Sequence, residues 1–212
     1  MNHGGVYIHV PFCRSRCSYC DFATGMFEGG LAARYVGALI KEIGEWREVP
    51  QPRDVDTIYF GGGTPSLLTA SQISEILAAI RSRFVVREGA EVTLEMNPGS
   101  VVDLSDPELS NDKLTELRRL GVNRASFGAQ TFDDHELKQL GRTHTAADIP
   151  ATFKELRATG FTNINFDLIA GLPGQTLAGW KSNLEQAMQL EPEHLSLYLL
   201  DVHEGTPLAG QI

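Results

Sequence analysis

Cysteine is scarce in this sequence: there are only three among 212 residues, and all of them lie within residues 13–20. An odd number confined to so short a stretch does not suggest a disulfide framework, and structural thiols are usually scattered through a core. The sequence also lacks an apolar run of the roughly 18 residues that a membrane-spanning helix needs. We therefore expect neither a disulfide-stabilised secreted protein nor a transmembrane segment.

Positive charge is also scarce, because 18 Lys and Arg stand against 27 Asp and Glu, for a formal net charge of -9. Proteins that bind nucleic acid usually carry a basic surface for the phosphates, so we expect no nucleic-acid partner. Residues 1–5 have neither the basic nor the apolar region of a secretory signal peptide. The sequence thus predicts a cytoplasmic protein.

The three cysteines that are present follow the spacing Cys13-x3-Cys17-x2-Cys20, directly after a short apolar run. This spacing suits a loop that folds three thiolates around one cubic iron-sulfur cluster. A fully ligated cluster uses four ligands, so one iron would stay open for a small chelating ligand. A structural zinc with His3 or His9 as fourth ligand is the alternative, although zinc sites usually pair thiols at two separated places.

Short apolar, β-branched runs alternate with longer helical periodicities, which is typical of repeated βα units and a parallel sheet. We expect strands at residues 6–10, 55–60, 91–96, 122–127, 163–169 and 194–200. Six units are too few for a closed eight-stranded barrel of about 250 residues, so the prediction is an open, partial barrel with helices outside. A doubly wound sheet is the alternative, but its Gly-x-Gly-x-x-Gly turn is missing after the first strand.

Several local signals refine this prediction. Pro50 and Pro52 would end the first βα unit, and Gly121 and Gly160 are expected helix C-caps. Short helices are expected near residues 133–140 and 149–159. A helix capped by Thr176 is expected to turn four large side chains inward, namely Leu177, Trp180, Leu184 and Met188.

Unusual residues collect at the carboxyl ends of five predicted strands, where barrel proteins build their active sites. They are the three cysteines, the glycines 61–63, Glu95, Gln130 just past the fourth strand, and Asp167. The glycines let backbone groups approach a ligand closely. Glu95 is a suitable acceptor for ribose hydroxyls, unless it is merely a solvent-facing edge residue. Asp167 is a charge within an apolar strand and should have a partner.

The segment Tyr7-Ile-His-Val-Pro-Phe-Cys13, followed by Cys17 and Cys20, resembles the opening of radical S-adenosylmethionine (SAM) proteins. It is most similar to the group that contains oxygen-independent coproporphyrinogen III oxidase (HemN) and the haem chaperone HemW, and the similarity runs along nearly the whole chain. The resemblance implies a 4Fe-4S cluster on the three cysteines, with SAM chelated at the open iron. Reduction of SAM there would give methionine and a 5′-deoxyadenosyl radical.

The resemblance also implies which further residues contact SAM. These are Tyr7, Tyr19, Gly62, Gly63, Thr64, Glu95, Gln130, Arg142 and Asp167. Arginine suits a carboxylate because its fork can bind two oxygens. The ligand beyond SAM would be haem or a porphyrinogen, and none of the six histidines identifies a haem ligand by itself.

Two departures separate the branches of this group. The oxidases have a fourth cysteine two residues after the third, where this chain has Phe22, and a long extension before the first strand. Both departures favour the haem-chaperone branch, whose members deliver haem to respiratory enzymes; coproporphyrinogen oxidation is the alternative. Family members also continue into a carboxyl-terminal domain with a His-Asn-x-x-Tyr motif. We expect residues 1–212 to be a single radical SAM core domain without it.

Overall fold

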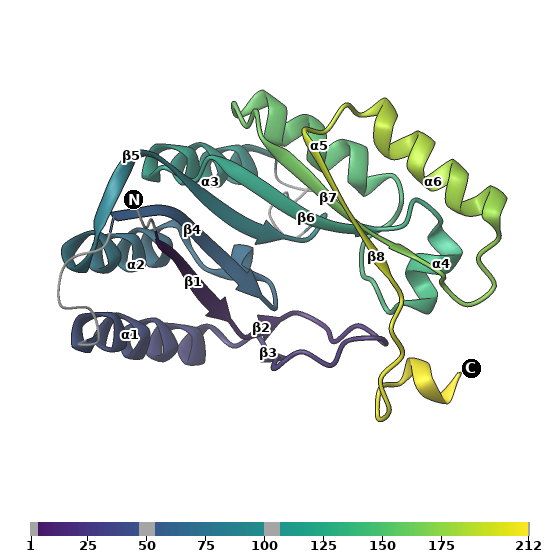
Figure 1. The fold of residues 1–212 in the computed structure, drawn as a ribbon, viewed down its shortest axis with the longest axis horizontal. Coiled ribbons are helices and arrows are strands. Elements are labelled where there is room, and N and C mark those ends of the chain that lie inside the picture. Colours follow the sequence, from purple (N-terminus) through teal and green to yellow (C-terminus); the bar gives the residue numbers. More distant parts are fainter. Residues whose placement is uncertain (1–3, 47–53, 100–106, 212) are drawn as a thin grey trace.

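A curved, fully parallel sheet with its strands in sequence order forms the centre of the computed structural model, which describes residues 4–46, 54–99 and 107–211 (Figure 1). The order is β1-β4-β5-β6-β7-β8. The strands are β1 (Gly4–Val10), β4 (Asp54–Gly62), β5 (Val85–Met96), β6 (Arg124–Gln130), β7 (Ile164–Ala170) and β8 (His194–Leu199). A doubly wound sheet would reverse its order at a switch point, so the sequential order confirms the predicted partial barrel.

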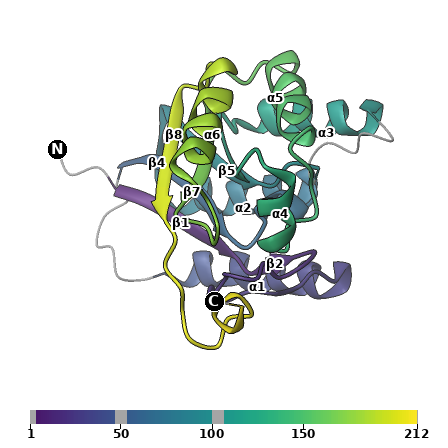
Figure 2. The same cartoon turned by 90° about the vertical axis from the view of Figure 1, so that its right-hand side faces the viewer.

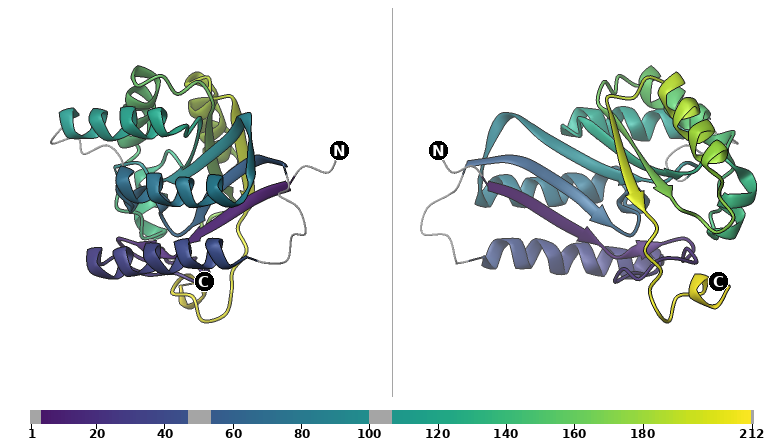
Figure 3. Two further views of the ribbon diagram at one scale, coloured as in Figure 1. Left: turned by 90° about the vertical axis from the view of Figure 1, so that its left-hand side faces the viewer. Right: turned by 45° about the vertical axis from the view of Figure 1, so that its right-hand side comes forward.

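Helices connect the strands and pack on the outer face of the sheet (Figures 2 and 3). They are α1 (Gly29–Glu45), α2 (Ala70–Arg83), α3 (Pro107–Leu120), α4 (Asp134–Gln139), α5 (Asp148–Ala158) and α6 (Leu177–Gln189), with short 3-10 turns η1 (Pro65–Leu67) and η2 (Leu208–Gly210). Within the described ranges, no helix is long and apolar enough to cross a bilayer. The predicted unit boundary at Pro50 and Pro52 lies outside the described residues.

The core lies between the sheet and these helices, and aromatic side chains fill its centre. Phe60 on β4, Phe127 on β6 and Phe166 on β7 are fully buried. The rings of Phe127 and Phe166, on neighbouring strands, meet edge to face with centroids 4.5 Å apart. Burying one such side chain stabilises the fold by about 1.5–3 kcal/mol. The predicted glycine caps are confirmed, because Gly121 and Gly160 have φ values of 102° and 88°, which favour glycine.

The predicted inward face of α6 is only half right. Trp180 and Leu184 pack against the core, but Leu177 and Met188 are 82% and 57% exposed. The buried Asn183 sets the orientation of the helix, because its side-chain oxygen accepts a hydrogen bond from the backbone N–H of Phe132 after β6. Leu177 and Met188 lie roughly a quarter turn away from that face.

Two further differences concern the strands near the predicted site. β6 begins two residues later than expected and ends three residues later, so that Gln130 is the last residue of the strand rather than following it. The residues after β1 were expected to form only a loop. They contain a small two-stranded parallel sheet, β2 (Phe12–Cys13) with β3 (Gly25–Met26), which fixes the first cysteine.

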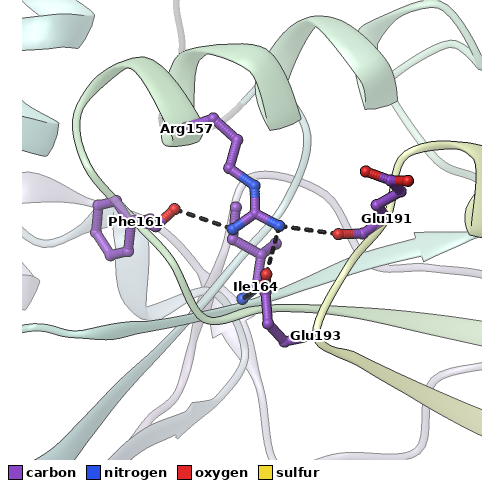
Figure 4. A network of polar contacts seen from close by, with 5 residues as sticks. All are labelled: Arg157, Phe161, Ile164, Glu191 and Glu193. Carbon is purple, nitrogen blue, oxygen red and sulfur yellow. Dashed lines mark hydrogen bonds and ion pairs between the residues drawn. The ribbon is translucent and has the colours of Figure 1, made fainter.

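At the opposite end of the sheet, Arg157 on α5 joins the helix to the turn before β8 (Figure 4). Its guanidinium donates to the backbone oxygens of Phe161 and Glu191 at 3.1 and 3.0 Å, and to the Glu193 carboxylate at 2.7 Å. The other Glu193 oxygen accepts from the backbone N–H of Ile164. Partial burial raises the pKa of Glu193, but these hydrogen bonds outweigh it and hold the pKa below its usual value.

We expect Arg157→Met to lower the free energy of unfolding by about 1–2 kcal/mol, because two carbonyls and a half-exposed carboxylate lose their donor. Lys154→Met on the exposed side of the same helix is the matched control and should change it by less than about 0.5 kcal/mol. Denaturant unfolding measures both. Since the pKa of Glu193 is lower in the folded state, its contribution is present above the pKa of the unfolded chain and disappears as the pH falls through the folded value. Equal stabilities for both variants would contradict this role.

Candidate functional site

The loop that carries the cysteines is attached to two distant segments of the chain. The backbone N–H of Ser18 donates to the carbonyl of Leu140 after α4 at 2.9 Å, and the Ser18 hydroxyl donates to the carbonyl of Gln139 at 2.9 Å. The backbone N–H of Leu208, beyond β8, donates to the carbonyl of Ser18 at 2.9 Å. Figure 2 shows the segment after β8 running down to this loop. The loop is therefore held by tertiary contacts on both sides.

Cys13 lies at the end of β2, against the turn that follows β4. The backbone N–H of Thr64 donates to the carbonyl of Phe12 at 2.7 Å, and the Thr64 hydroxyl lies 3.8 Å from the Cys13 sulfur. Burial raises the pKa of the Cys13 thiol, and the neighbouring Cys17 and Cys20 raise it further. Cys17 and Cys20 are thus both near enough to Cys13 to affect its charge.

Cys17 lies against the guanidinium of Arg142, which follows α4. One terminal nitrogen of Arg142 donates to the Cys17 sulfur at 3.4 Å, and the other donates to the Asn97 side-chain oxygen at 2.6 Å and to the Gly128 carbonyl at 2.8 Å. The Nε atom of Arg142 is buried and has no hydrogen-bond partner among the described residues. A buried donor without a partner is costly, so this atom is available to a ligand.

A cavity of about 350 Å³ opens at the carboxyl ends of the strands, within the range of ligand-binding pockets. All of the residues predicted for the cluster and SAM line it, except Tyr7. These are Cys13, Cys17, Cys20, Tyr19, Gly62, Gly63, Thr64, Glu95, Gln130, Arg142 and Asp167. Residues from five strands and their following loops therefore converge as expected. The part that each one plays in binding stays a prediction.

Two part-buried carboxylates line this cavity from strands on either side of β6. Glu95 on β5 accepts a hydrogen bond from the Tyr59 hydroxyl at 2.6 Å and one from the Gly62 backbone at 3.0 Å. Asp167 on β7 accepts from Asn165 at 2.8 Å and from Ser126 at 3.4 Å. Burial raises the pKa of both carboxyls, and these donors partly offset the increase. Each carboxylate therefore has the partners that a buried charge requires.

Tyr7 does not line the cavity, although the resemblance suggested a cofactor contact. Its ring stacks on that of Tyr59, with centroids 5.9 Å apart and an angle of 23° between the planes. Tyr7 is 58% exposed, and its hydroxyl lies 3.3 Å from the Nδ1 atom of His9. In this structure Tyr7 packs against Tyr59, which does not line the cavity either. Tyr19, in contrast, lines the cavity, and burial raises the pKa of its phenol well above the usual value.

The three consecutive glycines at the end of β4, of which Gly61 and Gly62 belong to the strand, serve the packing of the protein as well as any ligand. A Cβ atom on Gly61 would come within 2.8 Å of the Tyr59 ring, and one on Gly62 within 2.8 Å of the His9 ring. A Cβ atom on Gly63 would lie 2.6 Å from the Phe12 carbonyl oxygen and 2.9 Å from the Cys13 sulfur. Gly62 and Gly63 still line the cavity. Their neighbours, however, are also parts of β1 and the cysteine loop.

Sequence reasoning missed Asn97, Tyr59 and Ser126. Asn97 follows β5 directly, and its amide donates to the Thr64 hydroxyl at 3.0 Å while its oxygen accepts from Arg142. It therefore connects the surroundings of Cys13 and Cys17. The sequence contained a signal for Tyr59. Side chains two residues apart on a strand point to the same face of the sheet, so Tyr59 faces the same side as Gly61.

These residues provide two observations that bear on an iron-sulfur cluster and SAM. Within the described part of the chain, no three His, Cys, Asp or Glu side chains are close enough to ligate one metal ion. A cubic cluster makes a different demand, because its thiolates are spread over different irons. The thiols share one cavity with the part-buried carboxylates of Glu95 and Asp167 and with Arg142, whose buried Nε has no partner among the described residues. This set fits a cluster together with a zwitterionic, ribose-containing ligand.

Comparison with known proteins agrees with this geometry. The family model described as the radical SAM superfamily matches residues 7–187. The chain belongs to the radical SAM superfamily. Its cofactors are therefore those of the superfamily, a 4Fe-4S cluster and SAM.

Individual relatives narrow the similarity within the superfamily. The chain is 40% identical to the haem chaperone HemW of Lactococcus lactis over 200 residues, covering 94% of this chain and 50% of that protein. It is 37% identical to HemW of Escherichia coli over 202 residues, covering 95% and 51%. The structure of coproporphyrinogen III oxidase (HemN) from Escherichia coli matches with a TM-score of 0.83 and 32% identity, over 98% of this chain and 46% of that one. The chain is thus a HemW-like radical SAM protein that spans about half the length of the curated relatives it matches.

Proposed function

We propose that this chain is the radical SAM part of a haem chaperone, which binds a 4Fe-4S cluster, SAM and haem and passes haem to respiratory proteins. The observation that carries the proposal is the convergence of three thiols, two part-buried carboxylates and a buried arginine on one cavity, in a chain that is 37–40% identical to HemW proteins. The thiols and a redox cluster suit a reducing compartment, so we place the protein in the cytoplasm.

In this proposal each group of residues has a defined task. Cys13, Cys17 and Cys20 would hold the cluster, which together with SAM supplies one-electron chemistry when both are bound. The Nε atom of Arg142 would donate to the SAM carboxylate, and Glu95 would accept from the ribose hydroxyls. The remaining residues proposed to contact SAM are Tyr19, Gly62, Gly63, Thr64, Gln130 and Asp167. Tyr7 would act indirectly, because its ring stacks on that of Tyr59, which donates a hydrogen bond to the cavity residue Glu95.

We expect all three cysteines to be required for the cluster, because none of the described residues offers a fourth thiol. Anaerobic reconstitution with iron and sulfide should give a brown protein with close to full iron content, and Cys17→Ser should lose most of it. Thr115→Ser on the exposed side of α3 is the control for handling and should bind as much iron as the wild type. Full iron content in Cys17→Ser would contradict the ligand set.

Haem titration of the reconstituted protein separates the proposed carrier from the alternative enzyme. A stoichiometric haem absorption band without consumption of coproporphyrinogen supports the chaperone. Anaerobic decarboxylation of coproporphyrinogen supports the oxidase, for which the similarity to the HemN structure is the specific observation. Phe22, which is 63% exposed on the cavity rim, stands where the oxidases have a fourth cysteine and so favours the chaperone.

A further inference from the structure

Tyr59 on β4 does not line the cavity, but its hydroxyl donates a hydrogen bond to Glu95, which does line it. Its hydroxyl donates to the Oε1 atom of Glu95 at 2.6 Å, while the backbone N–H of Gly62 donates to the Oε2 atom at 3.0 Å. Both donors come from β4 and lie three residues apart. They hold the two oxygens of one carboxylate from the same side, so its orientation is fixed by a single strand.

The position of the Tyr59 ring is itself determined by its neighbours. Tyr7 stacks on one face of the ring, and the Cα atom of Gly61 lies so near the ring that an added Cβ would come within 2.8 Å of it. A phenol has one O–H to donate, and Tyr59 gives it to Glu95. The hydroxyl is therefore aimed at Glu95 by packing.

Several ionisable groups face Glu95, and they act in opposite directions. Asp167 on β7 lies close enough to disfavour a second negative charge, whereas His9 on β1 favours it. The Tyr7 and Tyr198 phenols also feel the charge of Glu95. Burial raises the pKa of Glu95, and the hydrogen bonds from Tyr59 and Gly62 lower it. An ionised carboxylate accepts hydrogen bonds through both oxygens, whereas a protonated one loses much of this capacity.

We propose that Tyr59 is a positioning residue that donates to the Glu95 carboxylate and directs it into the cavity, where Glu95 accepts the ribose hydroxyls of SAM. This inference rests on the proposed function, because it requires SAM to bind in this cavity. It assigns no contact between Tyr59 and SAM. It predicts instead that Tyr59 controls the pH range over which SAM binds.

The test is the dissociation constant of SAM for the anaerobically reconstituted protein, measured from about pH 5 to about pH 8. Tyr59→Phe removes one hydrogen bond to a charged acceptor and should move the midpoint of the pH dependence upward by roughly one unit. SAM binding at low pH should therefore fall about tenfold, and the loss should shrink as the pH rises. Iron content and the thermal midpoint should stay close to those of the wild type.

Two further variants complete the experiment. Glu95→Gln removes the titrating group, so adding Tyr59→Phe to it should not shift the midpoint of the pH dependence any further. Any pH dependence of SAM binding that comes from Asp167 or from SAM itself remains in the Glu95→Gln variant. Tyr35→Phe is the matched control, because its part-buried hydroxyl also donates a hydrogen bond, but to the backbone carbonyl of His9 rather than to Glu95. It should leave the midpoint unchanged.

The outcomes are distinguishable. A Tyr59→Phe protein that binds SAM more weakly by the same factor at every pH would overturn the inference, because a merely structural residue acts in that way. A shift of equal size in the Glu95→Gln background would also overturn it. Failure of the wild type to bind SAM would overturn the proposed function, and with it this assignment of Tyr59.

Discussion

Gly63→Ala should lose most of the iron-sulfur cluster, at least tenfold in iron bound per chain after anaerobic reconstitution. The added Cβ would lie 2.6 Å from the Phe12 carbonyl oxygen and 2.9 Å from the Cys13 sulfur, closer than nonbonded atoms approach. The residue 63 backbone has little room to move away from Phe12, because its N–H donates a hydrogen bond to the Val10 carbonyl at 2.8 Å. The Cys13 sulfur must therefore move, and a cluster tolerates little error in ligand position.

A matched control for this variant lies in α1. Gly37 is exposed in the helix, and an added Cβ there meets no atom within 4 Å. Gly37→Ala should leave iron content unchanged and stabilise the protein by about 0.5–1 kcal/mol, because alanine is the better helix former. Iron and sulfide analysis with circular dichroism measures both variants. Full cluster occupancy in folded Gly63→Ala would show that the cysteine loop does not depend on this close approach.

Arg142→Leu should destabilise the protein by about 3 kcal/mol and also reduce cluster binding. The variant removes the hydrogen bonds that Arg142 donates to the Asn97 oxygen and the Gly128 carbonyl, and it removes the cation beside Cys17. For a domain of this size, such a loss lowers the thermal midpoint by roughly 6–12 °C. Differential scanning calorimetry measures the change before reconstitution. Iron analysis then tests the effect on the cluster separately.

The pKa of His144 reports separately on the loss of the Arg142 charge. Burial, together with the charge of Arg142, lowers the pKa of His144 to about 4. Arg142→Leu removes the second cause, so the pKa of His144 should rise, which NMR titration detects. Arg119→Leu on the exposed side of α3 is the control and should change neither stability nor His144. Unchanged stability in Arg142→Leu would mean that the site tolerates the loss of its buried cation.

The sequence predicted the βα order and the open sheet because these depend on local periodicity. The strands appear within a few residues of their expected positions, except that β5 begins six residues earlier. Periodicity was less informative on α6, where Leu177 and Met188 are exposed. A polar residue, Asn183, takes the inward position there because its hydrogen bond is made to a segment far away in the sequence. A hydrophobic pattern does not contain that information.

The sequence by itself determined the chemistry of the candidate site, because thiolates, carboxylates and glycines at strand ends must meet at one edge of a parallel sheet. Only the tertiary structure decided how these residues support one another. It placed Tyr7 behind Tyr59, used residues 61–63 to make room for the protein's own side chains, and directed Arg142 towards Cys17 and Asn97. These are contacts between strands and loops distant in the chain, and their distances depend on how the sheet curves rather than on any local spacing.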